Sequence, residues 1–188
     1  MKPISALQYL KWTQLSKPTN DRIALRYIKK HKFRKFVEFG LGEGVRCERM
    51  IRVAQKYSGS GTIRYTGVDL FEARESSDTQ LKLIEMHRQL NGLGAKAQLV
   101  PGDFSSAIQR IANSHQRTDL VVVQSDQESD VFANEEFARA WKFLPRMLHA
   151  ASVVMLFYPN DEYEVLNFLD VEDQLKRVKG SETVKRAA

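Results

Sequence analysis

A glycine-rich segment between an apolar run and an amphipathic run constrains the fold more than any other feature of the chain. Residues 38–44 read Glu-Phe-Gly-Leu-Gly-Glu-Gly, and they overlap the end of a short apolar run at residues 35–39. Such a run, bounded by glycine, is typical of a buried parallel strand, and residues 45–57 have the pattern of a helix packed on a sheet. A tight turn between strand and helix aims backbone N–H groups at a ligand, so the segment predicts a ligand-binding turn.

The alternation of strand and helix continues through most of the chain. The predicted strands are residues 35–39, 62–70, 97–100, 119–123 and 152–158, and the predicted helices are residues 19–28, 45–57, 78–90, 105–114 and 134–149. This order predicts right-handed crossovers and therefore a Rossmann-like, doubly wound, mostly parallel α/β sheet. The strand at 119–123 is continuously apolar and is expected in the middle of the sheet. Pro145 predicts a break in the last helix.

Local signals suggest where two of the helices begin and end. Thr19, Asn20 and Asp21 offer side-chain oxygens that are expected to cap the first helix. Asn91 and Gly92 are expected to end the helix at 78–90 by adopting positive φ.

We expect one domain over residues 1–188, with an N-terminal helical segment at 1–33. Residues 160–188 leave alternatives open. Residues 161–169 suit a helix or a sixth strand, and the basic remainder suits a hairpin around 179–181 or disorder. The C-terminal strand pair is therefore expected to be truncated or atypical.

Composition and charge narrow the class of protein. Apolar residues make up 43% and charged residues 28% of the chain, as in globular proteins. We expect a cytoplasmic protein, because no apolar run suits a signal peptide or a membrane span, and because the single cysteine, Cys47, suits a reducing compartment as a buried apolar residue. The net charge of +6 favours anionic ligands. Basic residues gather at 29–35 and 176–186, but solvated helix ends explain such runs better than a nucleic-acid site does.

Three carboxylates follow predicted strands at the ligand edge. Glu38 precedes the first glycine by two positions, where the ammonium group of an amino acid suits it better than a pyrophosphate does. Asp69 lies 25 positions after Gly44, near the offset of about 20 residues at which a carboxylate accepts from ribose hydroxyls. We expect Glu38 and Asp69 to converge on one ligand. Asp103 suits the amino group of adenine beside Phe104, the N-cap of the following helix, or both.

A nicotinamide cofactor fits the glycine turn less well. The dinucleotide fingerprint places its third glycine where this chain has Val45.

With these residues in place, the chain resembles the class I S-adenosylmethionine-dependent methyltransferases over residues 20–158. The matching positions are the acidic and glycine residues Glu38, Gly40, Gly42 and Gly44, then Asp69, then Gly102, Asp103 and Phe104. The resemblance implies the fold and the cofactor S-adenosylmethionine. It also implies that the first motif holds the methionine part, that Asp69 with Leu70 holds the ribose, and that Asp103 with Phe104 holds the adenine.

The sequence after the fourth strand departs from two branches of the family. Metal-dependent O-methyltransferases have Asp-Leu-Val-Phe-Leu-Asp-Ala-Asp-His there, whereas this chain has Gln124 and Gln127 in place of the first acid and the histidine. Because hard cations prefer several carboxylate oxygens, we expect no metal. The tetrad Asn/Asp-Pro-Pro-Tyr of amino-methylating nucleic-acid enzymes is also missing, and Cys47 is off the strands that would suit a cysteine nucleophile.

We therefore expect a methyltransferase acting on an oxygen or nitrogen of a small polar molecule. Asp126, just past the fourth strand, is the candidate general base. Phe71, Arg74, Gln124 and Phe132 are candidate lining of the acceptor pocket. A protein that binds S-adenosylmethionine without transfer, an RNA methyltransferase and an NAD-dependent oxidoreductase remain alternatives. The acceptor and the oligomeric state stay open.

Overall fold

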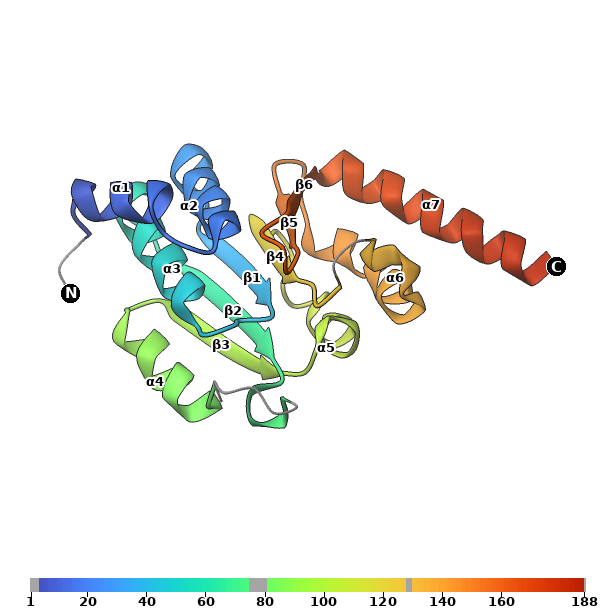
Figure 1. Ribbon diagram of the computed structural model, residues 1–188, viewed down its shortest axis with the longest axis horizontal. Coiled ribbons are helices and arrows are strands. Elements are labelled where there is room, and N and C mark those ends of the chain that lie inside the picture. The colour runs from blue at the N-terminus through green and yellow to red at the C-terminus, as the bar shows by residue number, and fades with distance from the viewer. Residues whose placement is uncertain (1–3, 75–80, 128–129, 188) are drawn as a thin grey trace.

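The computed structural model describes residues 4–74, 81–127 and 130–187, and these residues form a six-stranded sheet in the order β3-β2-β1-β4-β5-β6 (Figure 1). The strands are β1 (Lys35–Phe39), β2 (Arg64–Asp69), β3 (Lys96–Pro101), β4 (Leu120–Gln124), β5 (Val153–Phe157) and β6 (Tyr163–Asn167). The first five strands run parallel, and β6 pairs antiparallel with β5. The prediction of a doubly wound, mostly parallel sheet is confirmed, with β4 between β1 and β5 as expected.

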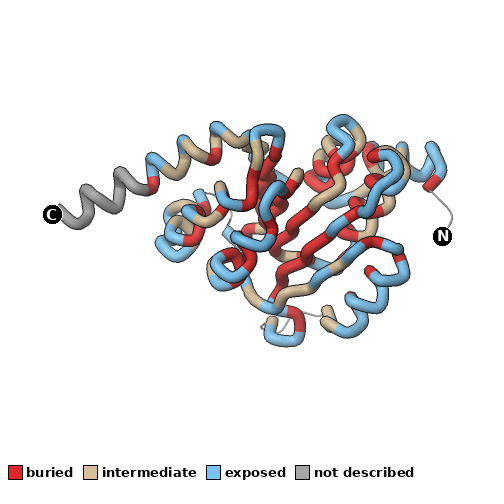
Figure 2. Tube along the Cα trace, turned by 180° about the vertical axis from the view of Figure 1, so that it is seen from behind, coloured by how far each residue is buried: buried red, intermediate tan, exposed pale blue. Residues whose placement is uncertain are grey.

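Helices cover both faces of the sheet (Figures 1 and 2). The helices are α1 (Ala6–Gln14), α2 (Thr19–His31), α3 (Val45–Tyr57), α4 (Leu83–Gly92), α5 (Phe104–Ile111), α6 (Glu135–Trp141) and α7 (Phe168–Ala187), with short 3₁₀ turns η1 (Phe71–Ala73), η2 (Val131–Ala133) and η3 (Leu144–Met147). None of the described helices is both long enough and apolar enough to span a membrane.

Two apolar clusters form the core, one on each face of the sheet. Alternate residues of a strand point to opposite faces, so Phe36 of β1 packs with α2 and α3, whereas Val37 and Phe39 pack with α5 and α6. Trp141 of α6 is wholly buried in the second cluster, and its Nε1 donates to the Val171 carbonyl of α7 at 3.4 Å. This contact ties the last helix to the domain.

The seam between β1 and β4 is pinned at its amino end by Asp119. One oxygen of this carboxylate accepts from the backbone amides of Arg34 and Lys35, both at 2.8 Å. The other oxygen lies 3.2 Å from Nε2 of His149. Polar groups thus join β1 and β4 at the amino ends of these strands, whereas the glycine turn lies at their carboxyl ends.

The capping signals predicted for two helices are wrong. α2 begins after Pro18 without a side-chain cap, because the amide of Thr19 donates instead to Asp161, far away in the sequence, at 3.1 Å. α4 does end at Gly92, but positive φ is adopted by Gly94 (73°) and not by Gly92. Residues 78–80 of that predicted helix lie outside the described residues. The break at Pro145 is confirmed, because α6 ends at Trp141 and Pro145 lies in η3.

The C-terminal segment resolves the alternatives that the sequence left open. Residues 163–167 form a strand, and the basic remainder is a helix, so the hairpin and the disorder are both wrong. The start of α7 carries its own signal. Asn167 accepts from the amides of Leu169 and Asp170 at 2.8 and 3.1 Å, while Asp170 accepts from the Asn167 amide at 2.8 Å. Such reciprocal bonds satisfy the free N–H groups of a helix start.

Candidate functional site

Three positions of the turn after β1 have backbone conformations that favour glycine. Gly40, Gly42 and Gly44 have φ values of 79°, 58° and 77°, and Gly44 is the N-cap of α3. These left-handed conformations cost other residues about 1–2 kcal/mol. A Cβ on Gly40 would lie 2.7 Å from Cβ of Gln124, whereas a Cβ on Gly42 would meet nothing within 4 Å. The first glycine therefore lets the turn touch the end of β4, and the second faces open space.

Glu38 is buried beneath this turn. Its two oxygens accept from Nε of Arg46 and from the hydroxyl of Tyr65, each at 2.6 Å. Burial raises the pKa of Glu38 above its ordinary value, although Arg46 and Tyr65 oppose that effect. The carboxylate belongs to an internal network, and the two donors that it meets both come from this chain.

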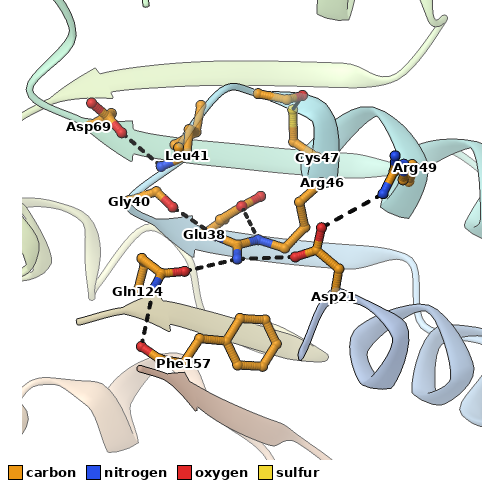
Figure 3. Close-up of polar contacts among 12 residues, drawn as sticks. Asp21, Glu38, Gly40, Leu41, Arg46, Cys47, Arg49, Asp69, Gln124 and Phe157 are labelled. Atoms are coloured by element: carbon orange, nitrogen blue, oxygen red, sulfur yellow. Dashed lines mark hydrogen bonds and ion pairs between the residues drawn. The ribbon is translucent and has the colours of Figure 1, made fainter. Parts of the chain in front are cut away.

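Arg46 of α3 joins the glycine turn, β4 and α2 (Figure 3). Besides Glu38, its guanidinium donates to the Gly40 carbonyl at 2.8 Å, to Oε1 of Gln124 at 3.0 Å and to Oδ1 of Asp21 at 3.3 Å. Burial lowers the pKa of Arg46, but Glu38 and Asp21 outweigh it and keep the pKa above its ordinary value. Arg46 therefore stays charged, and it uses the Gly40 carbonyl and Gln124 as acceptors.

Asp69 at the end of β2 has a full set of donors. Oδ1 accepts from the Phe71 amide at 3.0 Å and from Nε of Arg74 at 2.7 Å. Oδ2 accepts from the Leu41 amide at 2.7 Å and from a terminal nitrogen of Arg74 at 2.5 Å. A carboxylate has about four lone-pair sites, so all of them are used. Burial acts to raise the pKa of Asp69, but these hydrogen bonds, led by that of Arg74, hold it below its ordinary value.

The same guanidinium reaches the glycine turn. A terminal nitrogen of Arg74 donates to the Gly42 carbonyl at 2.9 Å. Arg74 therefore bridges the end of β2 and the open middle of the turn.

The two acids do not converge on one point as expected. Figure 3 shows Glu38 turned toward Arg46 and Asp69 turned toward the Leu41 amide. The side chain of Leu41 packs over Gly67 of β2. Gly67 is the pairing partner of Glu38 and lies two residues before Asp69, so Leu41 lies near both acids. The expectation is wrong because Glu38 pairs with a buried cation, Arg46, on the next helix. The sequence prediction missed that partner, which is buried at the start of α3 beside buried Cys47.

Asp103 and Phe104 lie at the start of α5. Oδ1 of Asp103 accepts from the Ser106 amide at 2.7 Å, and Ser106 Oγ accepts from the Asp103 amide at 3.3 Å, so the expected N-cap is confirmed as a capping box. The Phe104 ring stacks on Phe137 at 4.4 Å between centroids and meets Phe39 edge-on at 5.0 Å. Its buried ring forms the base of a cavity.

That cavity, about 220 Å³ in volume, opens at the carboxyl end of β4. Its lining includes three predicted site residues, Asp103, Phe104 and Asp126, together with the predicted acceptor residue Gln124. The full lining is Asp103, Phe104, Ser105, Val123, Gln124, Ser125, Asp126, Gln127, Val131, Asn134, Glu136 and Phe137. The structure thus brings the start of α5 and the end of β4 together at the edge where ligands bind in open parallel sheets.

The remaining predicted residues are spread around this cavity. Leu70 is 44% exposed beside Asp69, whereas Phe71 is buried in the core and does not line an open space. Phe132 lines a larger cleft of about 480 Å³ between η2, β6 and α7, with Tyr158, Glu164 and Arg177 among its other walls. η2 lies between the cleft and the smaller cavity, because Phe132 lines the cleft and Val131 lines the cavity. We place the site at the smaller cavity, since its lining includes the end of β4 and the motif residues Asp103 and Phe104. The glycine turn and Asp69 are not among its lining residues.

In the part of the chain that the structure describes, no three His, Cys, Asp or Glu side chains come close enough to hold a metal ion.

Comparison with known proteins identifies the fold. No protein-family model matches the sequence, and no curated protein matches it. Solved structures do match, at low sequence identity. CalS11, a TDP-rhamnose 3'-O-methyltransferase of calicheamicin biosynthesis, is 14% identical with a TM-score of 0.54, and the match covers 94% of this chain and 79% of CalS11.

Two further structures agree. PaMTH1 from Podospora anserina, a methyltransferase solved with SAH, is 11% identical with a TM-score of 0.51, covering 96% of this chain and 80% of that one. Rv0187 from MTB, solved with a cofactor, is 15% identical with a TM-score of 0.50, covering 80% of this chain. The chain spans 62% of the length of Rv0187. The sheet, its helices and the turn after β1 therefore have the class I methyltransferase fold.

Proposed function

We propose that this chain, with its class I methyltransferase fold, binds S-adenosylmethionine at the turn after β1 and transfers the methyl group to an oxygen or nitrogen of a small polar molecule. One observation carries the proposal. Gly42 adopts positive φ at a place where a Cβ would meet no atom within 4 Å, next to the strand end that bears Asp69. A positive-φ glycine facing open space beside a carboxylate suits close approach of a ligand.

The residues present fit the nucleoside part of the cofactor with one rearrangement. Asp69 would accept from the two ribose hydroxyls once Arg74 moves away, with Leu70 exposed beside it. Asp103 and Phe104 would border the adenine from the start of α5. The fit of the methionine part is different from the one that the motif implies. Glu38 and the Gly40 carbonyl already accept from Arg46, so they do not offer free acceptors to an ammonium group.

The chemistry asks little of the protein. When bound, S-adenosylmethionine supplies a methyl group activated by its sulfonium, so alignment of the acceptor is the main requirement. Asp126 lines the cavity at the end of β4 and is exposed to solvent. There it would take the proton of an acceptor hydroxyl. Gln124 is fixed by Arg46 and by the Phe157 carbonyl at 3.3 Å, which shapes the cavity beside Asp126.

The acceptor would enter from the side of η2. The smaller cavity and the larger cleft share η2 as a wall, through Val131 and Phe132. Aromatic and acidic side chains line both spaces, and the larger one also has Arg177; this mixture suits a small polar molecule. This agrees with the activity of CalS11, which is a TDP-rhamnose 3'-O-methyltransferase.

Two experiments test the proposal. Calorimetric titration with S-adenosylhomocysteine should show one site per chain, and the absence of heat at millimolar ligand would defeat the proposal. Transfer of a labelled methyl group to a panel of hydroxyl and amine acceptors then tests turnover. D126N should bind the cofactor as the unchanged chain does and should lose about 100-fold or more in turnover if Asp126 is the base.

A second function is favoured by one observation. The Gly40 and Gly42 carbonyls and both oxygens of Asp69 are hydrogen-bonded within the chain, as they would be in a protein that binds its nucleoside rarely or only as a regulator. Binding of S-adenosylhomocysteine without methyl transfer to any acceptor in the panel would support that function.

A further inference from the structure

Two arginines occupy the acceptor groups of the glycine turn. Arg46 donates to Glu38 and to the Gly40 carbonyl. Arg74 donates to both oxygens of Asp69 and to the Gly42 carbonyl. The groups that a nucleoside with an amino-acid tail would need are therefore already paired with cations of the chain itself.

The two arginines differ in how firmly they are held. The Arg46 side chain is 7% exposed and meets two buried carboxylates, a backbone carbonyl and an amide oxygen. Removing one partner of a buried ion pair leaves an uncompensated charge, so this network resists opening. Arg46 is therefore a permanent part of the site.

Arg74 is held at the rim. Its side chain is 19% exposed and has Asp69 as its carboxylate partner, in a two-pronged contact at 2.7 and 2.5 Å. On release, the guanidinium of Arg74 regains water. Breaking this contact therefore costs less free energy than breaking the buried contacts of Arg46. Asp69 loses two donors at the same time, and it needs two replacements.

A ribose with free 2'- and 3'-hydroxyls offers two such replacements. Each hydroxyl donates one O–H, and the two lie on adjacent carbons, as the two arginine N–H groups lie on one planar fork. The backbone donors to Asp69, from Leu41 and Phe71, are not in the way and would keep the carboxylate oriented.

We propose that Arg74 is a specificity-determining residue that competes with the ribose diol for Asp69, so that a ligand binds only if it replaces both guanidinium hydrogen bonds. This inference rests on the proposed function, since it concerns the same cofactor site. A nucleoside without the diol leaves Asp69 with Arg74 and gains nothing there. Arg74 thereby lowers the affinity of the site for every ligand and rejects those that lack either hydroxyl.

The test compares the unchanged chain with R74A, R74K and R88A by calorimetric titration of S-adenosylhomocysteine. Arg88 is an exposed residue of α4, so R88A removes the same charge away from the site and serves as the control. R74A should bind about tenfold or more tightly than the unchanged chain, and R74K should lie between them, because a lysine offers a single point charge in place of a fork. R88A should bind as the unchanged chain does.

Each outcome has one meaning. A gain of affinity in R74A supports the inference, and general damage to the fold does not produce such a gain. Equal or weaker binding by R74A than by the unchanged chain overturns it while leaving the proposed function standing. If the unchanged chain and all the variants fail to bind S-adenosylhomocysteine, the proposed function fails and the inference falls with it.

Discussion

Nε of Arg46 lies 2.6 Å from Oε1 of Glu38 in a part of the molecule where Glu38 is wholly buried. This ion pair joins α3 to β1 within the chain itself. It also redirects the acid that the glycine motif would place at the ligand. The chemistry of the turn is thus set by an arginine of α3 as much as by its glycines.

Replacing Arg46 by methionine should strongly destabilise the chain. Buried Glu38 would lose its cation, and Asp21 would keep only Arg49 at 3.9 Å. Breaking a buried pair in this way costs about 3–5 kcal/mol. Urea denaturation measures the change in the free energy of unfolding. R52M is the control, because Arg52 pairs with Glu48 at the surface of α3 and should matter by at most about 1 kcal/mol. Adding E38Q to R46M should recover part of the loss, and a further loss instead would contradict the ion-pair account.

Alanine at Gly40 and at Gly42 should have different effects. G40A should destabilise the fold, because its Cβ would lie 2.7 Å from Cβ of Gln124 in addition to the strain of positive φ. G42A carries only the strain, about 1–2 kcal/mol, but places a methyl group in the open space proposed for the ligand. Thermal melting and titration with S-adenosylhomocysteine separate the two effects. Unchanged ligand affinity in a folded G42A would argue against the placement of the ligand.

Asp103 should reveal whether its carboxylate serves the helix alone. D103A removes the capping box and should cost about 1 kcal/mol of stability. D103S restores a capping oxygen on a shorter side chain, so stability should return. If Asp103 also accepts from adenine, D103S should still bind S-adenosylhomocysteine more weakly than the unchanged chain. Full recovery of binding with stability would limit Asp103 to capping.

His115 should make stability depend on pH. It is buried, with Nε2 2.9 Å from Thr66 Oγ1 and Nδ1 3.0 Å from the Ile111 carbonyl, and burial holds its pKa below the ordinary value of 6.5. Above that value both the folded and the unfolded chain carry a neutral ring, so no stability is lost. Below it the unfolded chain takes up a proton that the folded chain refuses, and stability falls as the pH decreases.

Melting temperatures between about pH 7.5 and pH 5.5 measure this dependence. H115Q should lower the stability at the upper end and flatten the slope. H87Q, at an exposed position of α4, serves as the control and should keep the slope of the unchanged chain. An H115Q variant with an unchanged slope would show that another group titrates.

The sequence predicted the parts of the fold that depend on local pattern. β4 and β5 are apolar runs of the right length. β1 and α3 have the predicted boundaries, with Gly40 after β1 and Gly44 before α3. α2 begins at the predicted residue, but its capping group was missed for a tertiary reason, since its first amide donates to Asp161. The segment 161–169 was ambiguous because its residues suit either structure. Pairing with β5, which periodicity cannot reveal, decided for a strand.

The candidate site was also predicted in part. The turn, Asp69 and Asp103 follow from strand ends and glycine spacing, and the structure gathers Asp103, Phe104 and Asp126 around one cavity. The occupation of Asp69 by Arg74 could not be predicted, because a separation of five residues does not specify contact in a loop.

The two halves of the sheet meet at β1 and β4, and polar groups fasten that junction at both ends. Asp119 binds the amides of Arg34 and Lys35 at one end, and Arg46 links Gly40 with Gln124 at the other. A hinge between the halves would have to break both sets of bonds. Ligand entry should therefore leave the scaffold rigid, with adjustment limited to side chains at the rim.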